Sequence, residues 1–211
     1  MGSVFIVDPL YTLPFLLTMV LAFFAKQKNA YRWATLGLVL STGYLLWAFL
    51  AQQWVLQRAV TELKKQNIIY QKIFVGPTYF NSFLWRVVVL KKEKYYEGFG
   101  SVFDKNLAIH FKSHDRNLKL LTGLEKNSTI KKMKYFSHGF YAVAPNNKKH
   151  TLKVMDLRMG WSNHYYFQYR VAQRESKSKR YKPTAPKRVF FRPQLSEIKT
   201  VWNRIWKENN F

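Results

Sequence analysis

The uncharged stretch WATLGLVLSTGYLLWAFLAQQWVL, from Trp33 to Leu56, decides the fold of this chain. A helix that crosses a bilayer needs about 20 predominantly apolar residues, so this stretch is long enough to span a membrane. A second uncharged stretch, from Pro9 to Ala25, lies at the lower limit of that length, and the polar segment Lys26 to Arg32 separates the two. This order predicts a helical hairpin that enters the bilayer and returns.

Two alternatives compete with the membrane hairpin. A buried hairpin of a soluble protein would also be apolar, but an uncharged stretch of this length is long for a chain of 211 residues. A signal peptide needs a basic start and a small-residue cleavage site, and neither precedes Lys26. Tyr11, Tyr31, Trp33 and Trp54 lie near the ends of the two stretches, where aromatic rings favour the headgroup layer. We therefore expect lipid around this part of the chain.

The remainder of the chain is strongly basic. Residues 1–56 carry three basic residues and one acidic residue, a net charge of +2, so residues 57–211 carry +22 of the total of +24. We see no recognition helix and no RRM-type strand pattern, so we expect no specific nucleic-acid binding. Because Lys and Arg beside a membrane anchor are attracted to anionic lipid headgroups, lipid contact is the simplest interpretation. A solvated surface without any partner is an equal alternative.

After the second helix the periodicity changes to short runs rich in Val, Tyr, Phe and Trp, separated by polar turns. Such runs predict a mainly antiparallel sheet. The expected strands are 84–90, 95–103, 107–111, 139–143, 151–156 and 165–172, and one short helix is expected over 118–124.

The last part of the chain is predicted to be a strap followed by a helix. Residues 173–193 contain three Pro and eight Lys or Arg, a composition typical of an extended solvated segment. The final helix is expected to be amphipathic, with its apolar face formed by Leu195, Ile198, Trp202, Ile205 and Trp206.

Together these patterns predict a membrane-anchored α+β protein. A two-helix transmembrane hairpin with its stalk occupies 1–66, and a mainly antiparallel β domain outside the membrane occupies 67–172. The basic strap and the C-terminal amphipathic helix occupy 173–211.

The sequence contains no recognisable set of catalytic residues. It has no Cys, which excludes disulfides, thiolate zinc sites and cysteine nucleophiles, and no HExxH, GxSxG or P-loop is present. His110 and His114 have the spacing of a metal pair on a helix, but residues 107–111 are expected to form a strand, where positions four apart lie about 13 Å apart. The Gly98-Phe-Gly100 pair is interpreted as a bulge or a close backbone contact.

Two acidic residues have a specific structural interpretation. Asp8 is the one carboxylate in the apolar quarter, and a membrane-depth carboxylate is usually paired or functional. The alternative that we favour is that Asp8 caps the helix opened by Pro9. Asp156 and Arg158 are two residues apart at the end of an expected strand, which predicts a hydrogen-bonded pair that anchors a turn.

Four segments together resemble the YdjM-like family, bacterial proteins described as LexA-binding, inner-membrane-bound metal-dependent hydrolases. They are VDPLYTLPFLL from Val7, GPTYFNSFLWRVVV from Gly76, KYYEGFGSVFD from Lys94 and DLRMGWSNHYYFQYRVA from Asp156. The resemblance covers most of residues 5–172 and concerns the C-terminal portion of longer family members. It implies a multi-pass protein of the bacterial inner (cytoplasmic) membrane.

The resemblance also implies where the chemistry would lie. Longer members carry histidine motifs ahead of the DPLYT segment, whereas this sequence has no His before His110. We therefore expect either a truncated member or a catalytic half supplied by another chain. Asp8 would then contribute to a Zn or Mn ion completed by missing or partner residues, in an incomplete metal site. Trp85, Arg86, Asp156 and Arg158 also lie in family motifs, and we interpret them as structural.

Two functional hypotheses follow. The first is an inner-membrane protein of the metal-dependent hydrolase type, inactive alone and acting, when completed, on an unknown substrate. The second is a non-enzymatic membrane-anchored binding or scaffold module that contacts anionic lipid headgroups or a partner membrane chain. Basic residues flank the hairpin on both sides, so the side of the membrane that holds the β domain stays undetermined.

Overall fold

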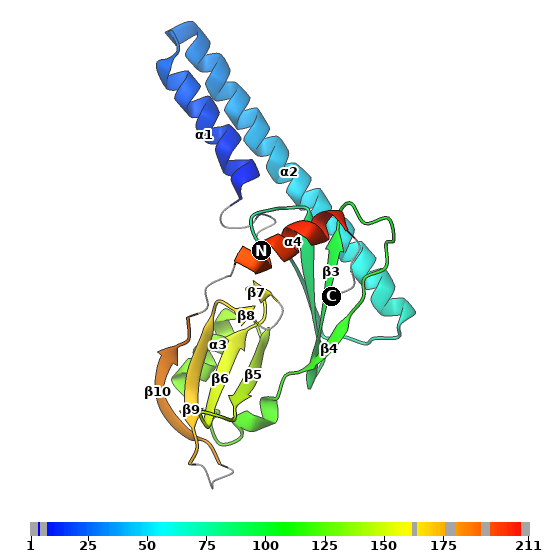
Figure 1. Cartoon of the computed structure of the whole chain (residues 1–211), viewed down its shortest axis with the longest axis vertical. Helices are drawn as coiled ribbons and strands as arrows, with labels where there is room; N and C mark the ends of the chain where they lie inside the picture. The colour runs from blue at the N-terminus through cyan, green and yellow to red at the C-terminus, as the bar shows by residue number, and fades with distance from the viewer. Residues whose placement is uncertain (1–3, 5–7, 162–163, 176–179, 191–194, 208–211) are drawn as a thin grey trace.

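The computed structural model describes residues 4, 8–161, 164–175, 180–190 and 195–207. Within these residues the chain forms a helical hairpin, two four-stranded antiparallel sheets and two further α-helices, so the α+β class is confirmed. Figure 1 shows the hairpin projecting from one end of the molecule, with the two sheets at the other end. The single sheet expected from the sequence is therefore divided into two.

The hairpin consists of α1 (Pro9–Phe24) and the first half of α2 (Gln27–Lys65). The side chain of Asp8 accepts a hydrogen bond from the Leu10 N–H at 3.0 Å, which confirms that Asp8 caps the helix opened by Pro9. In the described part of the chain, α2 is the one helix long and apolar enough to cross a membrane, and α1 is a shorter apolar helix of 16 residues.

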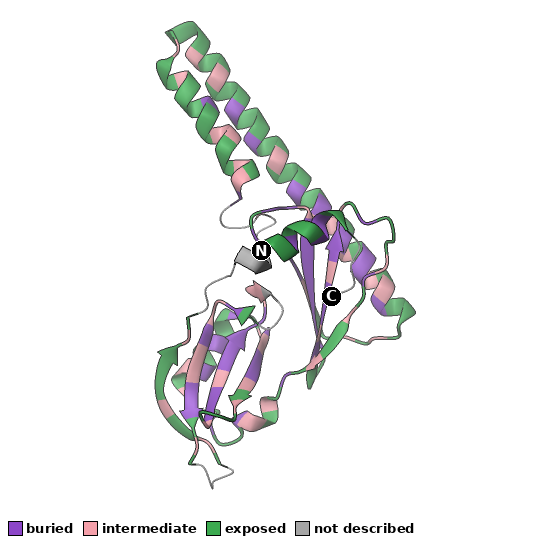
Figure 2. Cartoon of the chain, viewed as in Figure 1, coloured by how far each residue is buried: buried purple, intermediate pink, exposed green. Residues whose placement is uncertain are grey.

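The hairpin buries small or polar side chains and exposes large apolar ones, as the exposed residues along it in Figure 2 illustrate. Thr18 of α1 faces Gly37 of α2, where a Cβ atom would lie 2.2 Å from the Thr18 hydroxyl oxygen. Ser41 is buried one turn further along α2. These small residues allow the two helix backbones to approach closely.

The second half of α2 continues past α1 and packs on the first sheet. Its buried side chains recur every three or four residues and form one stripe: Ala51, Val55, Ala59 and Leu63. The stripe is rich in Ala, so the helix lies close to the strands. α2 ends at Lys65, near the predicted end of the stalk.

The first sheet has the strand order β1-β2-β3-β4. Its strands are β1 (Lys72–Pro77), β2 (Leu84–Leu90), β3 (Lys94–Ser101) and β4 (Lys112–Asp115). Every residue of β2 is buried, because alternate side chains of a strand point to opposite faces and both faces are covered. Trp85, Val87 and Val89 pack against α2, while Val88 and Leu90 pack against residues of the second sheet.

The strand predicted over residues 107–111 is absent, and pairing with β3 begins only at Lys112. The reason is steric: the buried Ile109 side chain lies over the glycines of β3. A Cβ atom at Gly98 would lie 2.7 Å from Cγ2 of Ile109, and one at Gly100 would lie 3.3 Å from its Cδ1. The glycines therefore provide close packing, one of the two interpretations offered by the sequence.

The second sheet has the order β10-β9-β6-β5. Its strands are β5 (Tyr141–Asn146), β6 (Thr151–Asp156), β9 (Gln168–Gln173) and β10 (Lys182–Arg188). A small hairpin of β7 (Gly160–Trp161) and β8 (His164–Tyr165) connects β6 to β9. The 3₁₀ helix η1 (Leu118–Leu121) and α3 (Ser128–Phe136) contribute Leu121, Ile130 and Met133 to its core.

Three sequence expectations for this part need correction. The predicted helix over 118–124 is only the short η1, and α3 was not expected, since just Ile130 and Met133 of its nine residues are buried. Residues 182–188 of the predicted strap form β10, whose side chains are mostly exposed. β10 pairs with β9, so the predicted boundary between 172 and 173 cuts through a sheet.

The C-terminal helix is present as α4 (Leu195–Trp206), and Ile205 of the predicted apolar face is buried. Val201, Arg204 and Ile205 are buried against the end of the first sheet, whereas Trp202 and Trp206 are exposed. On the buried face, Arg204 forms an ion pair with the buried carboxylate of Asp104.

Candidate functional site

Asp8 lies where α1, α2 and the β1–β2 loop meet. Its Oδ2 atom accepts hydrogen bonds from the hydroxyl groups of Tyr44 at 2.8 Å and Ser82 at 3.0 Å, and its Oδ1 atom accepts one from the Leu10 N–H. The side chain is only 1 % exposed. A buried carboxylate needs hydrogen-bond donors, and Asp8 has three of them from within the chain. This arrangement makes Asp8 a link between the hairpin and the first sheet.

The β1–β2 loop presents Ser82 to Asp8 through its own hydrogen bonds. The side-chain oxygen of Asn81 accepts bonds from the N–H groups of Phe83 and Leu84 at 2.9 and 2.8 Å, which holds the tight turn. Trp85 donates its indole N–H to the Ser82 carbonyl at 3.1 Å, and its ring packs in the core beneath α2. The GPTYFNSFLW segment is thus a structural unit, in which Trp85 anchors the loop.

Arg86 bridges the two sheets. Its guanidinium donates to the Glu97 carboxylate on β3 and to the Leu157 carbonyl that follows β6. Burial of Arg86 disfavours its charge, but the Glu97 carboxylate together with Tyr165 and Tyr95 outweighs this and holds the pKa of Arg86 above its ordinary value. Nearby, the hydroxyl groups of Tyr95 and Tyr165 lie 3.0 Å apart. Burial raises the pKa of both tyrosines, so their hydroxyl groups stay neutral beside the ion pair of Arg86 and Glu97.

The predicted pair of Asp156 and Arg158 is present. The Arg158 guanidinium donates to Asp156 Oδ2 at 2.7 Å, and the Asp156 Oδ1 atom also accepts from the Arg158 N–H at 2.9 Å. Arg158 donates a further bond to the Phe136 carbonyl at the end of α3. The pair therefore closes the turn after β6 and ties it to α3.

Sequence reasoning missed the buried cluster around Asp104. Asp104 accepts bonds from Arg58 of α2 at 3.3 Å, from Arg204 of α4 at 2.6 Å and from the Ser101 N–H at 2.7 Å. Arg58 also donates to the Ser101 carbonyl at 2.7 Å. The three charged residues are far apart in the sequence, so no local spacing signals them. Together they join the stalk, the first sheet and the C-terminal helix.

In the part of the chain that the structure describes, no three or more His, Asp or Glu side chains come close enough to hold a metal ion. His114 lies on β4 and stacks on Tyr95 with ring centroids 4.9 Å apart, while His110 is exposed. The residues that the sequence singled out lie in separate clusters: Asp8 accepts from Tyr44, Arg86 pairs with Glu97, and Asp156 pairs with Arg158. Among the described residues, the buried Nη2 atom of Arg86 has no hydrogen-bond partner.

One groove of about 420 Å³ lies between α3 and the second sheet. Met133, Phe136 and Phe167 line it, so it is mainly apolar, and Lys132 lies at its margin. No carboxylate or His is among its lining residues, so it offers no acid–base pair for catalysis.

Comparison of the chain with known protein families, with curated proteins and with solved structures yields no match. The described residues form hydrogen-bonded structural clusters at the base of the hairpin and between the sheets, and the hairpin exposes large apolar side chains.

Proposed function

We propose that this chain is a membrane-anchored binding module, in which α1 and α2 insert into a lipid bilayer and the two sheets lie on one side of it. The observation that carries the proposal is the inverted burial pattern of the hairpin. Its helix contact contains Thr18, Gly37 and Ser41, whereas its outward surface carries large apolar side chains such as Leu17 and Leu38.

This pattern is typical of helices in lipid. In water, large apolar residues would pack between the helices and polar residues would face outward. In a bilayer the lipid tails are as apolar as Leu, so helices associate through small and weakly polar residues. An apolar surface of this extent would also be a strong aggregation hazard on a water-soluble monomer.

The dimensions support two crossings. With 16 residues, α1 is about 24 Å long, slightly shorter than the roughly 30 Å hydrocarbon core of a bilayer. Lys26, Lys28 and Arg32 at the hairpin tip would reach the headgroups on the far side, because long basic side chains extend toward the interface. The proposed location is a bacterial inner membrane, as the family resemblance implies.

Membrane fractionation tests the anchor. After expression in bacteria, we expect the full chain to stay with the membranes when these are washed with alkaline carbonate, which removes peripheral proteins. Leu17→Arg combined with Leu38→Arg places two charges in the lipid-facing surface, at about 2.5–3.5 kcal/mol each, and should abolish stable insertion. Tyr135→Arg on α3 is the matched control and should leave insertion unchanged. A wild-type chain that is monodisperse in buffer without detergent would contradict the proposal.

The basic surplus supports an anionic lipid surface as what the module contacts. Residues 57–211 hold a net charge of +22, and a bacterial membrane offers negative headgroups within a Debye length of any domain held at its surface. Vesicle binding measured over a range of salt concentrations checks this: contacts made by the domain should weaken as salt rises, while the inserted hairpin should not be released.

The hydrolase activity implied by the family resemblance remains a weaker proposal. The Asp8 oxygens are taken by the donors of Leu10, Tyr44 and Ser82, and the described residues bring no second metal ligand to it. Metal analysis of the purified chain tests the point. Stoichiometric Zn or Mn that is lost in Asp8→Ala would favour the hydrolase, and a metal-free preparation would favour the binding module.

A further inference from the structure

The C-terminal helix α4 has an exposed aromatic face that the fold does not use. Val201 and Ile205 pack against Tyr79 and Leu84, which fixes the helix on the end of the first sheet. Trp202 and Trp206 lie on the same helix but are 57 % and 58 % exposed. Tryptophan is seldom left this open on a water-facing surface unless it contacts something else.

Phe103 extends this aromatic surface. Its ring stacks on Trp206 with centroids 4.7 Å apart, and it is itself 45 % exposed. The Phe83 ring also lies next to Phe103, with ring centroids 5.4 Å apart, and the preceding residue, Ser82, binds the Asp8 cap of α1. The aromatic surface therefore begins at the base of the hairpin.

The same surface is tied to α2 just below the hairpin. Asp104, the neighbour of Phe103, binds Arg58 of α2 and Arg204 of α4. The Arg58 guanidinium lies 4.7 Å from the centre of the Trp54 ring, which is also exposed. Trp54 and α4 are consequently held at one level along the hairpin axis. Figure 1 shows α4 crossing the molecule transverse to that axis.

The helix lengths place this level in the headgroup layer. If α1 occupies about 24 Å of the hydrocarbon core, the ten further residues of α2 from Tyr44 to Trp54 rise about 15 Å more. Measured from the far edge of the hydrocarbon core, the sum of about 39 Å extends about 9 Å past the roughly 30 Å core, which reaches the outer margin of the near headgroup layer. Tryptophan at this depth is typical of the aromatic belts of membrane proteins.

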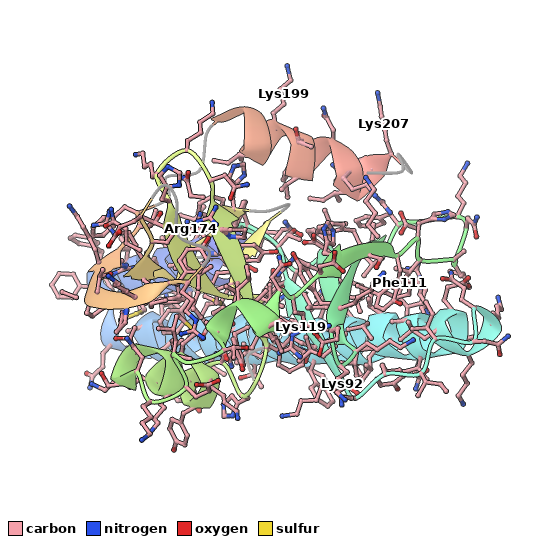
Figure 3. The ribbon with its side chains drawn as sticks, turned by 90° about the horizontal axis from the view of Figure 1, so that it is seen from below. Lys92, Phe111, Lys119, Arg174, Lys199 and Lys207 are labelled. Carbon is pink, nitrogen blue, oxygen red and sulfur yellow. The ribbon has the colours of Figure 1, made fainter. Side chains whose placement is uncertain are left out.

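Three described lysines lie on or beside the elements that carry the aromatic surface. Lys105, Lys199 and Lys207 are exposed, and Figure 3 shows Lys199 and Lys207 pointing away from the fold. An apolar aromatic surface with a basic margin is the pattern of helices that lie in the plane of a membrane interface and contact anionic lipid.

We propose that Trp54, Phe103, Trp202 and Trp206 form an aromatic girdle in the headgroup layer of an anionic leaflet, with α4 lying in the plane of the interface. The girdle rests on the proposed membrane anchor. A girdle of this kind would hold the first sheet at a fixed depth in the membrane through α4 and would restrict rotation of the domain about the end of α2.

Depth measurements with single cysteines test the girdle, and the absence of Cys from the chain gives a clean background. We would introduce Leu38→Cys, Trp202→Cys and Tyr135→Cys one at a time in the full chain, label each with a polarity-sensitive fluorophore, and reconstitute it in vesicles of phosphatidylethanolamine and phosphatidylglycerol. All three side chains are exposed, so the label does not disturb the core. Quenchers are a lipid with a nitroxide on its headgroup, a lipid with a nitroxide near the acyl-chain end, and iodide in the water.

We expect the Trp202→Cys label to be quenched several-fold more by the headgroup nitroxide than the Tyr135→Cys label on α3. The Leu38→Cys label should respond mainly to the acyl-chain nitroxide. A Trp202→Cys label that behaves like Tyr135→Cys, while Leu38→Cys remains lipid-quenched, would overturn the girdle and leave the anchor standing. Loss of lipid quenching at Leu38→Cys would remove the anchor as well.

A Trp202→Cys label that is shielded from iodide but insensitive to both lipid nitroxides would also overturn the girdle, because it would show that protein covers α4.

Two matched double variants test the contribution of the basic residues to the lipid contact. In the Trp202→Cys background, Lys199→Glu with Lys207→Glu should reduce headgroup quenching, whereas Lys131→Glu with Lys134→Glu on α3 makes the same charge change and should not. Equal behaviour of the two pairs would contradict the anionic-lipid contact.

Discussion

The two four-stranded sheets share antiparallel pairing but are stabilised in different ways. The first sheet is covered on both faces, its strand β2 has no exposed residue, and it contains the buried ion pairs of Arg86 with Glu97 and of Asp104 with two arginines. The second sheet has a core on the side of α3 and packs Ala142 and Met155 against the first sheet. Its buried ion pair, Asp156 with Arg158, joins residues only two positions apart, its edge strand β10 is mostly exposed, and its pair of Lys182 and Glu175 lies in solvent.

This difference follows from what each sheet is attached to. The first sheet carries the hairpin, the stalk and α4, so its charged clusters hold elements that are distant in the sequence. Buried ion pairs contribute little net stability but become costly when one partner is lost, so they fix one arrangement of the elements. The second sheet holds only local elements and needs no such fixation. The following predictions test this contrast, from the largest expected effect to the smallest.

Arg86→Met should be the most damaging change, because it leaves the Glu97 carboxylate buried without its partner. We expect a loss of about 3–5 kcal/mol in the free energy of unfolding, measured by circular dichroism in detergent. The double variant Arg86→Met with Glu97→Met replaces both charges by apolar groups and should recover most of that loss. Glu175→Ala, which breaks the exposed pair of the second sheet, should cost less than about 0.5 kcal/mol. Equal losses in Arg86→Met and Glu175→Ala would refute the contrast.

Gly98→Val tests the close packing of the first sheet. The new Cβ atom would lie 2.7 Å from Ile109 Cγ2 and 3.1 Å from the His110 carbonyl oxygen, so the crossing segment must move. We expect a loss of about 1–3 kcal/mol, as for other overpacked cores. Gly43→Val on α2 is the control, because a Cβ atom there meets nothing within 4 Å. The prediction would be wrong if Gly98→Val were as stable as wild type while Gly43→Val were destabilised.

Gly139→Ala tests the connection between α3 and the second sheet. Gly139 has φ of +87°, a conformation that costs L-residues about 1–2 kcal/mol, while space is available around its Cα atom. We therefore expect a loss of about 1 kcal/mol that comes from the backbone and not from packing. Gly139→Asn should lose less, because Asn tolerates this region better than Ala. A larger loss in Gly139→Asn than in Gly139→Ala would show that side-chain size is the cause.

The tyrosine pair between the sheets predicts an alkaline transition. Burial raises the pKa of Tyr95 and Tyr165 in the folded chain, whereas both would ionise near pH 10 when unfolded. Their contribution to stability is therefore complete below about pH 10 and is lost as the pH rises further. Tyr165→Phe should be slightly less stable than wild type at neutral pH, by about 1 kcal/mol, and the difference should narrow above pH 10. Tyr135→Phe, at an exposed site, should leave the stability unchanged at both neutral and alkaline pH. A stability difference between Tyr165→Phe and wild type that stays constant above pH 10 would contradict the prediction.

Much of the fold could be anticipated from local patterns. The hairpin, the cap at Asp8, strands β2 and β6 and the pair of Asp156 and Arg158 all depend on residues close together in the sequence, where apolar period and spacing are informative. The errors arose where long-range contacts decide. Residues 107–111 look like a strand, but Ile109 is needed above the glycines of β3, and β10 looks like a loop until β9 offers it an edge.

The same distinction applies to the candidate sites. By itself the sequence determined an apolar N-terminal quarter, a basic α+β remainder and a helix cap at Asp8, because composition and helix-terminus chemistry act over a few residues. Only the tertiary structure decided that Asp8 binds Tyr44 and Ser82, that Asp104 collects Arg58 and Arg204, and which face α4 leaves exposed. These contacts join residues up to a hundred positions apart, and buried charges find their partners through the packing of whole elements.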